Sequence, residues 1–191
     1  MEVLKEIREK SVEIAREEIR KYGLPSMFHL DLSLDAGKKL AKDLKADEDI
    51  VEIGIALMDV KLGQAFHDGV QAQHVKLSME FAEKFLEQFN ISNNVKDTIL
   101  NCVEAHHAKV PFQSLEAEIC ANADCYRFVH PKGVLYYFTV VARRFNDFEK
   151  ELNQVEAKLD EKMQIASIPA VKEEFKKFYD DFKTYINMCR E

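Results

Sequence analysis

The sequence has 191 residues, of which 47% are hydrophobic and 32% are charged, enough for one folded domain or for a domain with a helical appendage. A net charge of −7 disfavours binding to a nucleic-acid duplex, because such binding depends on clustered Lys and Arg that neutralise phosphates. No window approaches the roughly 20 apolar residues of a membrane span, and the charged first residues lack the apolar region of a secretory signal. We therefore expect a cytoplasmic protein without a membrane segment.

Four helices are predicted in the first half of the chain. Apolar residues at helical spacing indicate a helix over residues 1–22 and a second one from Ser26. A third is predicted over residues 47–62, with acids in its first turn, apolar residues almost all round afterwards, and Gly63 as its C-cap. Apolar residues repeating at three and four positions predict a fourth helix over residues 70–90.

Four more helices are predicted in the second half. Ser92 is expected to cap a fifth helix, and Ser114 a sixth that contains the segment ANADCYRF. Residues 133–163 resemble one long helix, apolar first and charged later, whose charged part would leave the core and could serve as a partner or dimer surface. A last helix follows Pro169. With only 6 Gly and 4 Pro to make turns, the chain is predicted to be all-α.

Two aspartates stand in apolar helical segments, where an unpaired charge is costly and needs an ion pair, a metal or a raised pKa. Asp59 follows a run of apolar residues, and its structural alternative is a last-turn Asp that reaches the surface beside Lys61. Asp124 lies within ANADCYRF, and its structural alternative is a surface ion pair with Arg127. The acids are therefore candidate ligands of a cation.

Four histidines accompany these acids, and each also has a structural explanation, such as a satisfied core histidine or an imidazolium at a helix end. Adjacent helical residues point about 100° apart, so both members of the pair His106 and His107 would face inward only if the helix frays before Pro111. As a set, imidazoles and carboxylates without thiolates suit Fe, Mn, Zn, Co or Ni. The candidate metal ligands are His29, Asp59, His74, His106, His107 and Asp124.

The order of these residues resembles the HD-domain superfamily, over roughly residues 27–138. The resemblance gives the family's first His to His29, the Asp of its His-Asp pair to Asp59 and its last Asp to Asp124, and it implies that His74 with His106 or His107 would bind a second ion. It implies an HD-domain-like helical bundle that forms a single domain. Its predicted limits are 1–191, with a core over 24–138 and a C-terminal helical extension over 139–191.

The sequence departs from the family pattern before Asp59, where Met58 replaces the metal-binding His. A thioether is a soft and weak ligand, so a site built from His29, Asp59 and Asp124 is impaired more than one built from Asp59, His74 and His106. An actual His-Asp dipeptide, His67-Asp68, is the alternative motif, but it precedes Gly69 in a predicted loop.

The resemblance implies a metal-dependent phosphohydrolase that acts on a nucleotide or another small phosphorylated metabolite. Asp59 and His74 would be the catalytic residues, with one or two divalent ions (Fe, Mn, Zn, Ni, Co or Mg) as cofactor. One alternative is a catalytically impaired module of the same fold that binds a ligand or a protein, for which Met58 is the best evidence. A di-iron oxygenase is a further alternative, and a homodimer is left open.

Overall fold

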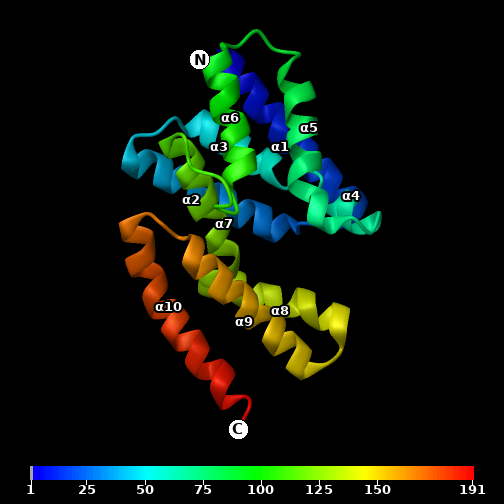
Figure 1. The fold of residues 1–191 in the computed structure, drawn as a ribbon, viewed down its shortest axis with the longest axis vertical. Helices are drawn as coiled ribbons and strands as arrows, with labels where there is room; N and C mark the ends of the chain where they lie inside the picture. Colours follow the sequence, from blue (N-terminus) through cyan, green and yellow to red (C-terminus); the bar gives the residue numbers. More distant parts are fainter. Residues whose placement is uncertain (1) are drawn as a thin grey trace. The chain divides into compact units, whose positions relative to one another are not determined.

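The computed structural model describes residues 2–191, and within this range the regular secondary structure consists of helices alone, which confirms the predicted all-α fold (Figure 1). The helices are α1 (Glu2–Tyr22), α2 (Met27–Leu44), α3 (Glu48–Met58), α4 (Leu62–His67), the 3-10 helix η1 (Gln71–Gln73), α5 (His74–Leu86), α6 (Asn93–Ala105), α7 (Leu115–Val129), α8 (Pro131–Phe145), α9 (Phe148–Ile165) and α10 (Pro169–Met188).

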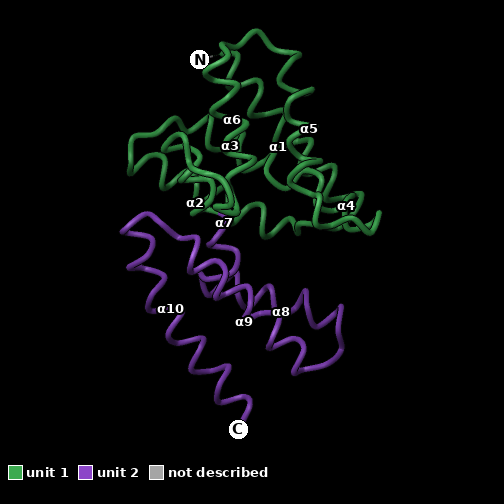
Figure 2. Tube along the Cα trace, viewed as in Figure 1, with its two compact units in different colours: residues 1–123 green, residues 124–191 purple. Residues whose placement is uncertain are grey.

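The chain forms two compact units, residues 1–123 and residues 124–191, which are coloured separately in Figure 2. The division falls inside α7, so this helix supplies residues to both units. The predicted limits of a core over 24–138 and an extension over 139–191 stay a prediction. Over residues 2–191, no helix combines the length and the apolar character that a membrane span requires.

The first unit is organised around α3, which packs against α1, α2, α5 and α6. Asp47 starts this helix by accepting a hydrogen bond from the backbone N–H of Ile50. Every residue from Ile53 to Val60 is buried, as expected for a helix surrounded by others. Gly54 allows a close approach of α6, because a Cβ atom there would lie 2.5 Å from Cβ of Cys102.

The third predicted helix ends earlier than its apolar pattern indicates. It stops at Met58, where Asp59 leaves helical geometry with φ −118° and ψ 16°, and the N–H of Leu62 donates to the carbonyl of Asp59 to close a turn. The predicted C-cap at Gly63 was wrong, because Gly63 belongs to α4. A side chain at Gly63 would meet the carbonyl oxygen of Leu24 at 2.5 Å, so glycine serves close packing here.

In the second unit, α9 packs against both α8 and α10. The single long helix predicted over residues 133–163 was wrong, since the chain breaks between α8 and α9. Asn146 adopts left-handed geometry with φ 48°, a conformation that asparagine tolerates at helix ends, and Asp147 caps α9 through the N–H of Lys150. The predicted last helix after Pro169 is confirmed.

Candidate metal centre

Three helix ends in the first unit bring together an aspartate and three histidines. Asp59 follows the last residue of α3, His74 is the first residue of α5, and His106 directly follows α6 with His107 next. Because α3, α5 and α6 pack against one another, these ends meet. Each of His74, His106 and His107 has one ring nitrogen within 4.8 Å of a ring nitrogen of the other two, and these residues form the three-histidine group.

Backbone carbonyls fix which nitrogen of two of these rings is available. Nδ1 of His74 lies 2.9 Å from the carbonyl oxygen of Gln71, and Nδ1 of His106 lies 2.7 Å from that of Val103. A carbonyl oxygen only accepts hydrogen bonds, so both Nδ1 atoms carry the proton and donate it. In each neutral ring the lone pair is therefore on Nε2, as in histidines that ligate metals.

These two Nε2 atoms converge on one carboxylate oxygen. Oδ1 of Asp59 lies 3.6 Å from Nε2 of His74 and 3.7 Å from Nε2 of His106, too far for hydrogen bonds. Nε2 of His107 lies 3.2 Å from Nε2 of His74. Two bare nitrogens at that separation repel unless a proton or a cation lies between them, so His107 either donates to His74 or shares an ion with it.

The donor atoms fit a divalent ion. Ligands held about 2.0–2.2 Å from one ion are about 3.0–3.4 Å apart in octahedral or tetrahedral geometry, close to the separations of 3.2–3.7 Å found here. Three imidazoles and one carboxylate suit Zn, Fe, Mn, Co or Ni. Asp59 and His106 also stand at helix C-termini, where the partial negative charge of the backbone favours a cation.

Adjacent histidines reach the same centre because α6 ends just before them. The helix stops at Ala105, and Ala108 adopts left-handed geometry with φ 52°. Asn101 holds the following loop by donating to the carbonyl of Pro111 and accepting from the backbone N–H of Gln113. The helix therefore ends before Pro111, which is the condition under which both imidazoles can face the same centre.

The turn after α3 is held in place from α5. The hydroxyl of Ser78 accepts a hydrogen bond from the backbone N–H of Lys61, and the Lys61 ammonium lies 3.2 Å from Glu18 and over the ring of Phe81. Asp59 is only 7% exposed, so the alternative in which it reaches the surface beside Lys61 was wrong. These contacts fix the turn that begins at Asp59.

Two further predicted residues of the first unit are buried outside the three-histidine group. Met58 is the last residue of α3 and is 1% exposed. His29 is 4% exposed on α2, which packs against α3, and its backbone N–H donates to the hydroxyl of Ser26. Its role as a ligand stays a prediction.

Asp124 belongs to the second unit, where it is 2% exposed. Its Oδ1 lies 2.7 Å from a guanidinium nitrogen of Arg127, and its Oδ2 lies 2.6 Å from the ammonium of Lys162 on α9. The ion pair with Arg127, which was the structural alternative to metal binding, is present. It is buried, however, and does not lie at the surface. Burial alone would lower the pKa of Lys162, but Asp124, through its charge and its hydrogen bond, outweighs burial together with Cys125 and Glu161, so the pKa is raised and Lys162 remains an ammonium. No local pattern indicated that Lys162 would be buried, because it lies among charged residues of α9.

The His67-Asp68 dipeptide occupies a different environment. Nδ1 of His67 lies 3.0 Å from the carboxylate of Asp68, and the two side chains are 74% and 47% exposed. This pair closes the short helix α4 at the surface. It does not join the three-histidine group, so His67 is a suitable control for it.

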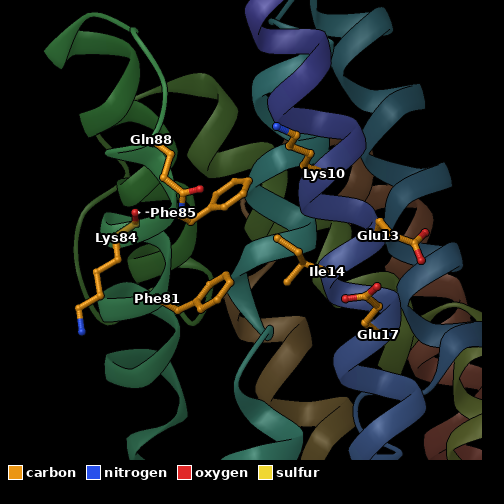
Figure 3. A pocket seen from close by; sticks show the side chains of 8 residues that line it. All are labelled: Lys10, Glu13, Ile14, Glu17, Phe81, Lys84, Phe85 and Gln88. Carbon is orange, nitrogen blue, oxygen red and sulfur yellow. Dashed lines mark hydrogen bonds between the residues drawn. The ribbon is translucent and has the colours of Figure 1, made fainter.

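The first unit also has an open groove of about 640 Å³ between α1 and α5 (Figure 3). Ile14, Phe81 and Phe85 form its apolar floor, and the side chains of Lys10 and Glu17 lie along its α1 side. None of the predicted site residues lines this groove. It is therefore separate from the candidate metal centre.

Fold and site together define an all-helical protein with a centre of imidazoles and a carboxylate. No family model matches the sequence. The chain has the fold of a predicted HD superfamily hydrolase from an uncultured Thermotogales bacterium, at a TM-score of 0.62 and 16% identity over 94% of this chain and 87% of that one. It also has the fold of Bacillus subtilis YpgQ, solved in complex with ADP, at a TM-score of 0.66 and 16% identity over 98% and 93%.

In sequence, the chain is 28% identical over 132 residues to ribonuclease Y of Lactobacillus acidophilus and 24% identical over 135 residues to ribonuclease Y of Fusobacterium nucleatum. The matched segments make up 68% and 71% of this chain but only 22% and 25% of those proteins. The resemblance to the HD-domain superfamily predicted from the sequence is thus confirmed, and the fold is that of the HD superfamily hydrolases.

Proposed function

We propose that the protein is a metal-dependent phosphohydrolase whose ion is held in the first unit by Asp59, His74, His106 and His107. The observation that carries the proposal is the pair of fixed tautomers, which turns the Nε2 lone pairs of His74 and His106 toward the same oxygen of Asp59. Neutral imidazoles oriented by backbone carbonyls are what a divalent ion requires. His29 is the further ligand that the HD-domain resemblance implies.

The chemistry divides between the ion and the chain. A bound divalent ion supplies positive charge against a phosphoryl group and acidity to water at the site. Asp59 and His106, whose side chains are 9% and 1% exposed, close one side of the centre against bulk water. His74 is 16% exposed and His107 is half-buried, so the substrate approaches from their side.

A small phosphorylated ligand, such as a nucleoside diphosphate, is the substrate class we propose. YpgQ, which shares the fold over most of both chains, binds ADP. The relatives in sequence are named ribonucleases, and their substrate is also a phosphate ester, although the chain spans only about a fifth of their length. The net charge of −7 favours the small ligand over a long polyanion.

Metal analysis of protein purified without chelator, followed by phosphate-release assays, tests the proposal. The panel comprises ADP, ATP, p-nitrophenyl phosphate and a short single-stranded RNA, each with Mn²⁺, Mg²⁺ or Fe²⁺. We expect stoichiometric metal and turnover of a nucleotide, both lost in Asp59→Asn and His74→Ala and both kept in His67→Ala. Wild-type protein with neither metal nor turnover would contradict the proposal.

Met58 favours a second candidate, a catalytically impaired module that binds a ligand without hydrolysing it. Met58 is buried at the position where the HD-domain pattern has a metal-binding His. This candidate predicts saturable ADP binding in calorimetry, with no phosphate release under any metal. Oxygen consumption by protein loaded with two Fe²⁺ would instead indicate the di-iron oxygenase.

A further inference from the structure

The carboxylate of Asp124 has a cationic partner on each of its oxygens. Oδ2 lies 2.6 Å from the ammonium of Lys162, and Oδ1 lies 2.7 Å from the guanidinium of Arg127. The three side chains are 2%, 1% and 5% exposed, respectively. The ammonium of Lys162 also lies 3.4 Å from Glu161, so it is enclosed by two carboxylates. A buried charge-assisted network of this kind is made of strong hydrogen bonds.

We propose that Lys162 and Arg127 act as the resident cations of Asp124, so that Asp124 anchors α9 to α7 and contributes nothing to metal binding. Lys162 is thereby assigned as a structural and positioning residue. The part of this inference that concerns metal rests on the proposed function, whereas the anchoring role does not.

Charge balance supports this assignment. The positive charges of Arg127 and Lys162 are already balanced by Asp124 and Glu161, so a divalent ion brought to the Asp124 carboxylate would be repelled by both cations. Moving the lysine aside would leave a buried ammonium with fewer partners, which is a large cost. Asp124 is therefore far better satisfied by its neighbours in the second unit than by a metal.

The centre in the first unit does not need Asp124. His74, His106 and His107 offer three nitrogen donors within one compact group, and Asp59 adds an oxygen donor 3.6 Å from Nε2 of His74 and 3.7 Å from Nε2 of His106. Four such donors complete the usual coordination of a zinc-like ion, and three leave a position open for catalysis. The ligand set is thus sufficient without a residue of the second unit.

A double-mutant cycle in the presence of chelator tests the anchoring role. Asp124→Asn and Lys162→Met each leave a buried charge with fewer partners, and each is expected to lower the melting temperature by about 10 °C. The double variant, which removes both charges, is expected to lose much less than the sum of the two. Lys158→Met is the matched control on α9, because the side chain of Lys158 is 27% exposed and its ammonium lies 2.7 Å from the carboxylate of Glu161. Additive losses in the double variant would overturn the proposal.

Titration with Mn²⁺ alone tests the exclusion of Asp124 from metal binding. Asp124→Asn is expected to bind Mn²⁺ with an affinity within about twofold of the wild type, while Asp59→Asn loses at least about tenfold. Equal losses in the two variants would show that Asp124 is a ligand and would overturn the proposal. If wild-type protein binds no Mn²⁺, the proposed function fails, and the cycle in chelator still decides whether Asp124 and Lys162 are coupled.

Discussion

The carbonyl oxygen of Val103 lies 2.7 Å from Nδ1 of His106 and thereby fixes the tautomer of that imidazole. Val103 is three residues earlier in the chain, in the last turn of α6, so the ring bonds back to its own helix. Its Nε2 atom is consequently presented to Asp59 without further adjustment. This preorganisation lowers the cost of binding an ion, because little side-chain freedom remains to be lost.

His106→Ala should therefore weaken metal binding strongly. Removing a preorganised ligand is expected to raise the Kd for Mn²⁺ at least about tenfold, measured by calorimetry. His67→Ala, which removes an exposed imidazole outside the centre, is the matched control and should leave the Kd unchanged. Unchanged affinity in His106→Ala would rule out this residue as a ligand.

Met58→His should raise metal affinity if position 58 faces the ion as the HD-domain pattern implies. An imidazole buried without a partner costs about 1–3 kcal/mol, so the apo form should be less stable than the wild type. Added Mn²⁺ should then raise its melting temperature more than that of the wild type.

Met58→Leu is the control for this substitution, because it keeps the volume and adds no donor, and it should cost less than about 1.5 kcal/mol. Equal responses of Met58→His and Met58→Leu to Mn²⁺ would place position 58 away from the ion.

Gly54→Ala should destabilise the first unit although alanine is normally the better helix residue. In an open helix the change gains about 1 kcal/mol. Here the new Cβ would lie 2.5 Å from Cβ of Cys102 on α6 and 2.8 Å from Sγ of Cys120 on α7. Helix α3 must therefore move away from both α6 and α7. We expect a net loss of about 1–3 kcal/mol in urea unfolding. A gain in stability would mean that these helices separate without cost.

Helix starts were easier to predict from the sequence than helix ends. Ser92 and Ser114 act as predicted, since their hydroxyls accept hydrogen bonds from backbone N–H groups three residues on. The end of α3 was missed because Val60, in the turn that follows, is buried like the helix before it, so the apolar pattern continues past the last helical residue. The break at Asn146 lies between two segments that each have helical periodicity, and only its left-handed backbone marks it.

The candidate site was predictable in its residue types but not in its grouping. His74 and Asp59 were singled out as polar residues in apolar segments, and that signal depends on local sequence alone. The joint approach of His106 and His107 depends on where α6 ends, which is set by packing. The burial of Lys162 could not be predicted from the sequence, because a lysine among charged neighbours has the same sequence pattern whether it is solvated or buried.

His130 should make the second unit sensitive to acid. Its Nδ1 accepts a hydrogen bond from the N–H of Lys132 at the start of α8, which requires a neutral ring, and its ring packs against Tyr126 and Phe178. Burial lowers its pKa below the ordinary value of 6.5, only partly offset by the charge of Glu174. The unfolded chain therefore takes up the proton more readily than the folded one. The contribution of His130 to stability is complete above about pH 6.5 and is lost as the pH falls through the lower pKa of the folded state.

His130→Asn should keep the cap and remove this dependence, because asparagine is a good N-cap residue that does not titrate. We expect the urea midpoint of the wild type to fall more between pH 7.5 and pH 5.0 than that of His130→Asn. His67→Asn, which changes an exposed histidine of the first unit, should behave like the wild type. Parallel pH profiles for the wild type and His130→Asn would show that the imidazole tolerates its proton in the folded state, and the cap would then be formed by other groups.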